Sequence, residues 1–149
     1  MTTTVHDGAG RADESAEAMT ILVYSDDANT RQAVKQAVGR RPARDVPRVQ
    51  WVECATHPAV IKALDAGGID VCILDGESAP VGGMGISHQI KEEIYQCPPV
   101  IVLTGRVQDN WLAAWSLADA AVAHPLDPRV LADTVAAQMR TRRSAVATQ

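Results

Sequence analysis

The sequence predicts an α/β fold, in which a parallel sheet of five strands carries helices on both of its faces. Three observations lead to this prediction. Apolar runs of strand length alternate with amphipathic segments of helical period from residue 20 onward. Two runs, residues 69–74 and 100–103, are almost continuously apolar, as parallel strands buried on both faces are. Acidic residues directly follow two of the runs, and α/β sheets build their sites at the carboxyl ends of strands.

Each expected strand is a short run of apolar residues, many of them β-branched. The first run is Ile-Leu-Val-Tyr, and the second, Val-Gln-Trp-Val-Glu, alternates apolar with polar residues. The third and fourth runs, Ile-Asp-Val-Cys-Ile-Leu and Val-Ile-Val-Leu, are the most apolar, and Ala-Ala-Val-Ala is the last. The expected strands are residues 21–24, 49–53, 69–74, 100–103 and 120–123.

Between the strands, apolar residues recur three and four positions apart, which is the spacing of one helical face. The first such segment places Val34 and Val38 on one face, for example. The last begins at Asp127-Pro128, because aspartate is a good N-cap and proline suits the first helical position. The expected helices are residues 29–38, 57–64, 84–94, 111–117 and 129–139.

The chain of 149 residues is long enough for one domain with a substantial core. We expect residues 1–18 to form a flexible N-terminal tail, residues 19–141 the folded domain, and residues 142–149 a short C-terminal tail. No apolar run approaches the roughly 18 residues that span a bilayer, and no secretory signal is present. The net charge of −4 argues against direct DNA binding. Three cysteines without metal-like spacing indicate reduced thiols in a cytoplasmic protein.

Acidic residues mark the ends of the first and third expected strands. Asp26 and Asp27 follow the first strand after Ser25, and Asp75 and Glu77 follow the third. Because the carboxyl ends of parallel strands meet at one edge of a sheet, we expect these groups to converge in a crevice that holds a cation.

With these motifs in register, the chain resembles the receiver domain of two-component response regulators, of an orphan, single-domain, atypical and actinobacterial-looking kind. The resemblance covers about residues 20–141 and implies a flavodoxin-like (βα)5 fold, doubly wound, with strand order 2-1-3-4-5. It rests on the order and spacing of four short motifs. These are residues 21–27, 73–77, 99–105 and 123–125.

The resemblance implies that Asp75 is the phosphoacceptor. It also implies a Mg²⁺ site formed by Asp26, Asp75 and the backbone carbonyl of Glu77. Ser25 and Asp27 would be neighbours in the acidic pocket, with Ser25 at the position of the family's first acid. A serine there removes one acidic ligand, so we expect a weakened Mg²⁺ site.

The residues that would contact the phosphoryl group and report its presence are Thr104 and His124. Thr104 matches the family's hydroxyl residue, whereas His124 stands where the family has lysine. Imidazole is shorter than the lysine side chain and is not permanently charged. The family's switch aromatic corresponds to Ala121, which has no ring to move.

Two surfaces are candidates for contact with a partner. Trp111 and Trp115 lie four residues apart, and they either fill the core or anchor an interface. Arg40, Arg41 and Arg44 crowd one loop, and a second arginine cluster follows near residue 140. These charges are either solvated or form a docking patch for an acidic partner.

Two hypotheses for the function follow. In the first, the chain is a single-domain response regulator that takes a phosphoryl group from a histidine kinase and acts through protein–protein contact. In the alternative, it is a phosphorylation-independent pseudo-receiver that serves as a docking subunit of a larger assembly. The few residues after the domain leave no room for an output domain, so we expect no enzyme activity, no small-molecule substrate, no direct DNA binding and no membrane insertion.

Overall fold

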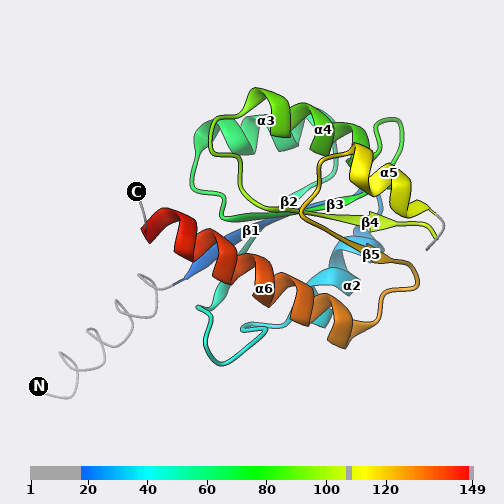
Figure 1. Cartoon of the computed structure of the whole chain (residues 1–149). Coiled ribbons are helices and arrows are strands. Elements are labelled where there is room, and N and C mark those ends of the chain that lie inside the picture. The colour runs from blue at the N-terminus through cyan, green and yellow to red at the C-terminus, as the bar shows by residue number, and fades with distance from the viewer. Residues whose placement is uncertain (1–17, 107–108, 148–149) are drawn as a thin grey trace, which may run out of the picture.

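A computed structural model describes residues 18–106 and 109–147 of the chain (Figure 1). Within these residues five parallel strands alternate with five helices, and the strand order in the sheet is β2-β1-β3-β4-β5. The predicted fold class and strand order are therefore confirmed. The strands are β1 (Met19–Tyr24), β2 (Val49–Cys54), β3 (Val71–Asp75), β4 (Val100–Thr104) and β5 (Ala120–Ala123). The helices are α2 (Ala28–Val38), α3 (His57–Ala66), α4 (Gly83–Glu93), α5 (Asn110–Trp115) and α6 (Pro128–Ala147).

The helices cover both faces of the sheet. Helices α2 and α6 pack on one face, and α3, α4 and α5 lie on the other (Figure 1). Successive strand residues point to opposite faces, so each strand contributes to two cores. In β3, for example, Ile73 joins the core under α2 and α6, whereas Leu74 joins the core under α3 and α4.

Polar side chains cap the starts of α2 and α6. Asp27 Oδ1 accepts the amide of Asn29 at 2.8 Å at the start of α2. Asp127 Oδ1 accepts the amide of Arg129 at 2.9 Å, which confirms the cap predicted from Asp127-Pro128. Because the first amides of a helix have no partner within it, these caps fix where each helix begins.

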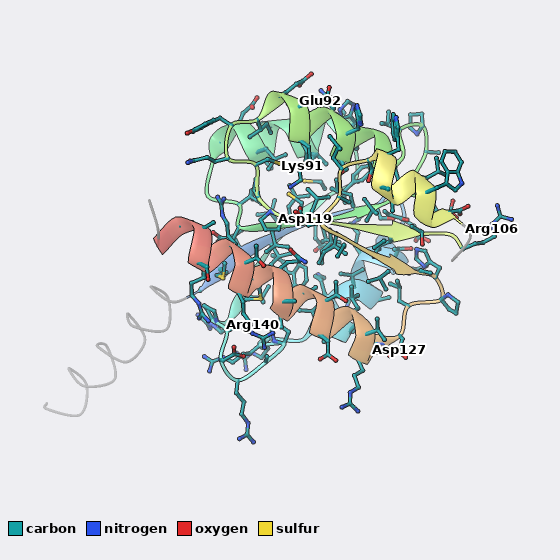
Figure 2. All side chains as sticks on the ribbon, in the orientation of Figure 1. Lys91, Glu92, Arg106, Asp119, Asp127 and Arg140 are labelled. Atoms are coloured by element: carbon teal, nitrogen blue, oxygen red, sulfur yellow. The ribbon has the colours of Figure 1, made fainter. Side chains whose placement is uncertain are left out.

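The close approach of α4 to β3 requires a glycine at the first residue of that helix. A Cβ on Gly83 would lie 2.7 Å from the backbone carbon of Leu74 and 2.8 Å from that of Asp75. Only a residue without a side chain can bring the start of α4 so near the end of β3. Near the other end of α4, Lys91 forms an ion pair with Asp119, at 2.7 Å between Nζ and Oδ2 (Figure 2). This pair ties α4 to the start of β5.

Most element boundaries differ from the prediction by one or two residues, and the differences in β3 and α6 bear on the site and on the C-terminal end. Strand β3 begins at Val71, two residues later than expected, and includes Asp75. Helix α6 continues to Ala147, so residues 142–147 are helical although we expected a tail there. The apolar pattern stops at Met139 because the later residues leave the core, whereas the helix continues because alanine and arginine favour it.

Other expectations concern the ends of the chain and the membrane. The expected N-terminal tail lies outside the described residues except for Ala18, and so do residues 148 and 149. Among the helices that the structure describes, none has the length and apolar character needed to cross a membrane.

Candidate functional site

The carboxyl ends of β1, β3 and β5 surround a pocket of about 290 Å³, which we call the Asp75 pocket. The expected convergence of the strand-end residues is therefore present. Asp75 is the last residue of β3 and is buried. The pocket is lined by Asp26, Asp27, Thr30, Asp75, Glu77, Gly105 and His124.

Each oxygen of the Asp75 carboxylate accepts a hydrogen bond. Oδ2 accepts from Ser25 Oγ at 2.7 Å and from Ser78 Oγ at 3.4 Å. Oδ1 accepts the backbone amide of Glu77 at 3.0 Å. These donors hold the carboxylate in one orientation, with Oδ1 as the oxygen nearest His124.

Ser25 is a hydrogen-bond donor at the position where the resemblance led us to look for an acid. Its side chain is buried, and its Oγ also accepts the amide of Asp27 at 3.1 Å. Arg31 Nη1 donates to the Ser25 carbonyl at 2.6 Å, which fixes the backbone at the end of β1. In place of a second buried charge, Asp75 therefore has a neutral partner that is held in place.

Ser78 and Tyr24 complete this network, and the sequence analysis assigned neither of them to the site. Ser78 Oγ accepts the amide of Asp26 at 2.9 Å, and the Tyr24 hydroxyl donates to the carbonyl of Val81. Burial, followed by the charges of Asp26 and Asp75, raises the pKa of the Tyr24 phenol. The position of Ser78 three residues after Asp75 is a signal that could have identified it.

Asp26 and Asp27 have different roles at the mouth of the pocket. Asp27 caps α2, so one of its oxygens is already engaged. The Asp26 carboxylate lies at the surface, and the one hydrogen bond it accepts from the described residues comes from the amide of Ala79, at 3.4 Å. The Glu77 side chain extends across the pocket to Gly105, where an added Cβ would lie 1.6 Å from Glu77 Oε1. The carboxylates of Asp26 and Asp75 line one pocket and are oxygen donors of the kind that Mg²⁺ prefers, so the residues present fit this cation.

Thr104 is the last residue of β4, and His124 directly follows β5. In the described part of the chain, each has a buried side-chain atom without a hydrogen bond. These atoms are Thr104 Oγ1 and His124 Nε2. His124 Nε2 lies 3.6 Å from Asp75 Oδ1, and the His124 amide donates to the Thr104 carbonyl at 2.8 Å. Buried polar atoms normally find partners, so an unpartnered His124 nitrogen this close to a carboxylate is consistent with a site for a polar group. Thr104 is not among the residues that line the pocket. Ala121, at the position of the family's switch aromatic, is exposed.

The two tryptophans are at the surface, so the expectation that they fill the core is wrong. The exposed fractions are 69% for Trp111 and 52% for Trp115. Two residues of α4, Ser87 and His88, attach the end of α5 to α4. Ser87 Oγ donates to the carbonyl of Ser116 at 2.9 Å, and the His88 ring both stacks on Trp115 at 4.4 Å and bonds to its carbonyl.

The arginine loop lies elsewhere, on the α2 and α6 side of the sheet (Figure 1). Trp111 and Trp115 therefore belong to one surface, which we call the tryptophan surface, and Arg40, Arg41 and Arg44 to another. The two candidate partner surfaces therefore lie on opposite faces of the sheet.

Comparison with known proteins identifies relatives that this chain matches over nearly their whole length. Two curated relatives are uncharacterized response regulatory proteins of Mycobacterium tuberculosis, from strains CDC 1551 and H37Rv. Each is 54% identical over 127 residues, which covers 85% of this chain and 96% of the relative. No family model matches the chain.

Solved receiver domains share the fold. The receiver domain of an HD domain-containing protein from Pseudomonas fluorescens Pf-5 has a TM-score of 0.73 at 16% identity, covering 89% of this chain and 95% of that one. A response regulator from Thermotoga maritima, solved in complex with Mg²⁺ and BeF, has a TM-score of 0.65 at 22% identity, covering 80% and 98%. From its sequence relatives and its fold, the chain belongs to the response regulatory proteins and forms their receiver domain.

Proposed function

We propose that Asp75 accepts a phosphoryl group and that the chain then signals through contact with a protein partner. One observation supports this most strongly: among the described residues, His124 Nε2 has no hydrogen bond and lies 3.6 Å from Oδ1 of the buried and oriented Asp75 carboxylate. Thr104 Oγ1, on the neighbouring strand β4, also lacks one. A phosphoryl group on Asp75 would bring three acceptor oxygens to this position.

In the proposed reaction, an Asp75 carboxylate oxygen attacks the phosphorus of the donor. The new P–O bond forms as the bond between phosphorus and the leaving group breaks, so that acetyl phosphate would release acetate and a phosphohistidine kinase would release its imidazole. A carboxylate is a weak nucleophile, so the reaction depends on alignment and on neutralisation of charge. Ser25, Ser78 and the Glu77 amide supply the alignment, because they hold the carboxylate by its two oxygens.

Charge neutralisation would come partly from a divalent cation. The Thermotoga maritima relative was solved with Mg²⁺, and in this chain Asp26, Asp75 and the Glu77 carbonyl would hold it. Mg²⁺ supplies positive charge to the phosphoryl oxygens when bound. We propose that its affinity is low, because Ser25 offers a hydroxyl where an acid would add charge.

His124 would supply the second positive charge, but only when it is protonated. Its distance of 3.6 Å from Asp75 Oδ1 leaves it close enough to reach a phosphoryl oxygen. For the partner contact we propose the tryptophan surface, since exposed tryptophans are frequent anchors of protein interfaces.

Intact-protein mass spectrometry tests the phosphoacceptor role. We would incubate the chain with Mg²⁺ and acetyl phosphate, and compare wild type with Asp75→Asn and with Asp133→Asn, an exposed acid of α6. We expect wild type and Asp133→Asn to gain one phosphoryl group that hydroxylamine removes, and Asp75→Asn to gain none.

Absence of a mass gain in wild type, or an equal gain in Asp75→Asn, would contradict the proposal. Such a result would favour the alternative, a docking subunit that works without phosphorylation. Ala121 and His124 are the positions at which this chain departs from the receivers that switch on phosphorylation. In that case a partner would bind wild type and Asp75→Asn equally well, through the tryptophan surface.

A further inference from the structure

A second pocket, of about 560 Å³, lies at the opposite edge of the sheet from Asp75. It is formed by the start of β1, the loop between α2 and β2, and the last turns of α6, which lie side by side in Figure 1. The loop and α6 each bring two arginines to it, from positions about a hundred residues apart in the sequence. We call it the arginine pocket, after Arg41, Arg44, Arg142 and Arg143.

The carboxylates that line the arginine pocket are engaged with other groups. Asp45 binds Arg140 through two hydrogen bonds, of 2.7 and 2.8 Å. Asp70 accepts the amide of Thr20 at 2.9 Å and lies 3.9 Å from Arg142 Nε.

Within the described residues, three of the four lining arginines form no close ion pair, although the hydrogen bonds of Arg140 and, to a smaller extent, the charge of Arg143 lower the pKa of Asp45. In the part of the chain that the structure describes, Arg41, Arg44 and Arg143 form no ion pair. The pocket therefore has positive charge that its own carboxylates do not neutralise.

Stabilisation of a helix end does not explain this cluster. Cations in the last turn of a helix interact favourably with the helix dipole, but the last turn of α6 carries no basic residue, because Arg142 and Arg143 lie before it. Arg41 and Arg44 belong to the loop between α2 and β2.

Apolar residues form the floor of the arginine pocket, and an ion pair joins two of the segments that surround it. Met19 and Val46 are buried beneath it, and Val146 is exposed at its rim. The bidentate pair between Asp45 and Arg140, the latter labelled in Figure 2, ties the loop to α6. The pocket is therefore preformed, and its volume is in the range of small-molecule sites.

We propose that the arginine pocket binds a small molecule that carries at least one phosphate group and an apolar body. Several guanidinium groups from different segments match the charge and geometry of phosphate oxygens, which they bind in pairs of hydrogen bonds. The floor formed by Met19 and Val46 would cover the apolar part of the ligand. A concave pocket of limited volume favours a compact ligand over an extended acidic peptide.

Isothermal titration calorimetry on the full chain tests this inference, with ADP and inorganic pyrophosphate as probes. The buffer contains EDTA at constant ionic strength, so that neither probe binds through Mg²⁺ at the Asp75 pocket. We expect one site per chain, with ADP bound more tightly than pyrophosphate because it has an apolar body. Arg44→Gln combined with Arg143→Gln should weaken ADP binding at least tenfold, since each charge-assisted contact contributes substantially to affinity.

Two control variants separate this site from other effects. Arg129→Gln removes an exposed arginine at the other end of α6, and Asp75→Asn removes the proposed phosphoacceptor. We expect both to bind ADP as wild type does, and thermal melting should show that the double variant remains folded.

Three results would overturn the inference. The first is a dissociation constant above about 1 mM for both probes. The second is unchanged binding by the double variant. The third is tighter binding of an aspartate- and glutamate-rich peptide than of either probe, which would make the pocket a docking site for an acidic segment. Each result is independent of whether Asp75 accepts a phosphoryl group.

Discussion

Replacing Ser25 with aspartate should couple the stability of the domain to Mg²⁺. Ser25 Oγ lies 2.7 Å from Asp75 Oδ2, and both side chains are buried. The variant puts a second carboxylate at this contact and removes a hydrogen bond to a charged group. Without a cation, we expect the free energy of unfolding to fall.

The size of the effect follows from the two changes. Two like charges about 4 Å apart repel by about 4 kcal/mol at an effective dielectric constant near 20. The lost charge-assisted hydrogen bond contributes about 1.5–3 kcal/mol. Because rotation of the new side chain relieves part of the repulsion, we expect a loss of about 3 kcal/mol or more in EDTA.

The assay is urea unfolding in EDTA and at increasing Mg²⁺ concentration. The matched control is Ser25→Asn, which has the size of aspartate without its charge. Ser25→Asp should recover more stability with Mg²⁺ than wild type or Ser25→Asn, because the added carboxylate strengthens the site and a bound ligand stabilises the folded state. Equal losses for the two variants in EDTA, with equal responses to Mg²⁺, would refute the assignment of Ser25 to the metal side of Asp75.

Three further predictions concern the scaffold. Gly83→Val should lower the free energy of unfolding by about 3 kcal/mol, because the new side chain meets the β3 backbone. Gly85→Ala should raise it by about 0.5–1 kcal/mol, because the space around Gly85 is open. Equal effects of the two variants in urea unfolding would contradict this placement of α4. The hydrogen bonds from Arg140 lower the pKa of Asp45 from 3.8 to about 2. The pair of Asp45 and Arg140 therefore stabilises the fold above pH 4, and this stabilisation is lost as the pH falls toward 2. Thermal melts of Asp45→Asn should accordingly lose less stability over that interval than wild type does, and parallel pH profiles would argue against the pair. Burial raises the pKa of the Cys72 thiol, so a thiol reagent should label it only after unfolding, and rapid labelling of the native protein would contradict its burial.

The fold was predictable because its signals are local. Continuous apolar runs identify β3 and β4, and the alternation of strand and helix requires parallel pairing. The grouping of Asp26, Asp75 and His124 followed from the same topology, because residues at the carboxyl ends of parallel strands meet at one edge.

Other features depend on contacts that no local pattern records. Trp111 and Trp115 have the spacing of a buried helical face, but α5 is a short helix that presents them to solvent. Ser78 joins the site only because the loop after β3 turns back over Asp75. The meeting of the loop arginines with those of α6 requires the packing of α2 against α6, which brings distant segments together.

The attachment of α5 to α4 has a consequence for how a change at the Asp75 pocket would affect the tryptophan surface. Gly83 places the start of α4 against the backbone of Asp75, and His88, further along α4, holds the backbone of Trp115. A displacement at the end of β3 would therefore reach α5 through α4, by way of Gly83 and His88. Such a route would need no rotating ring at Ala121, and it would change the orientation of the two indole rings that a partner would touch.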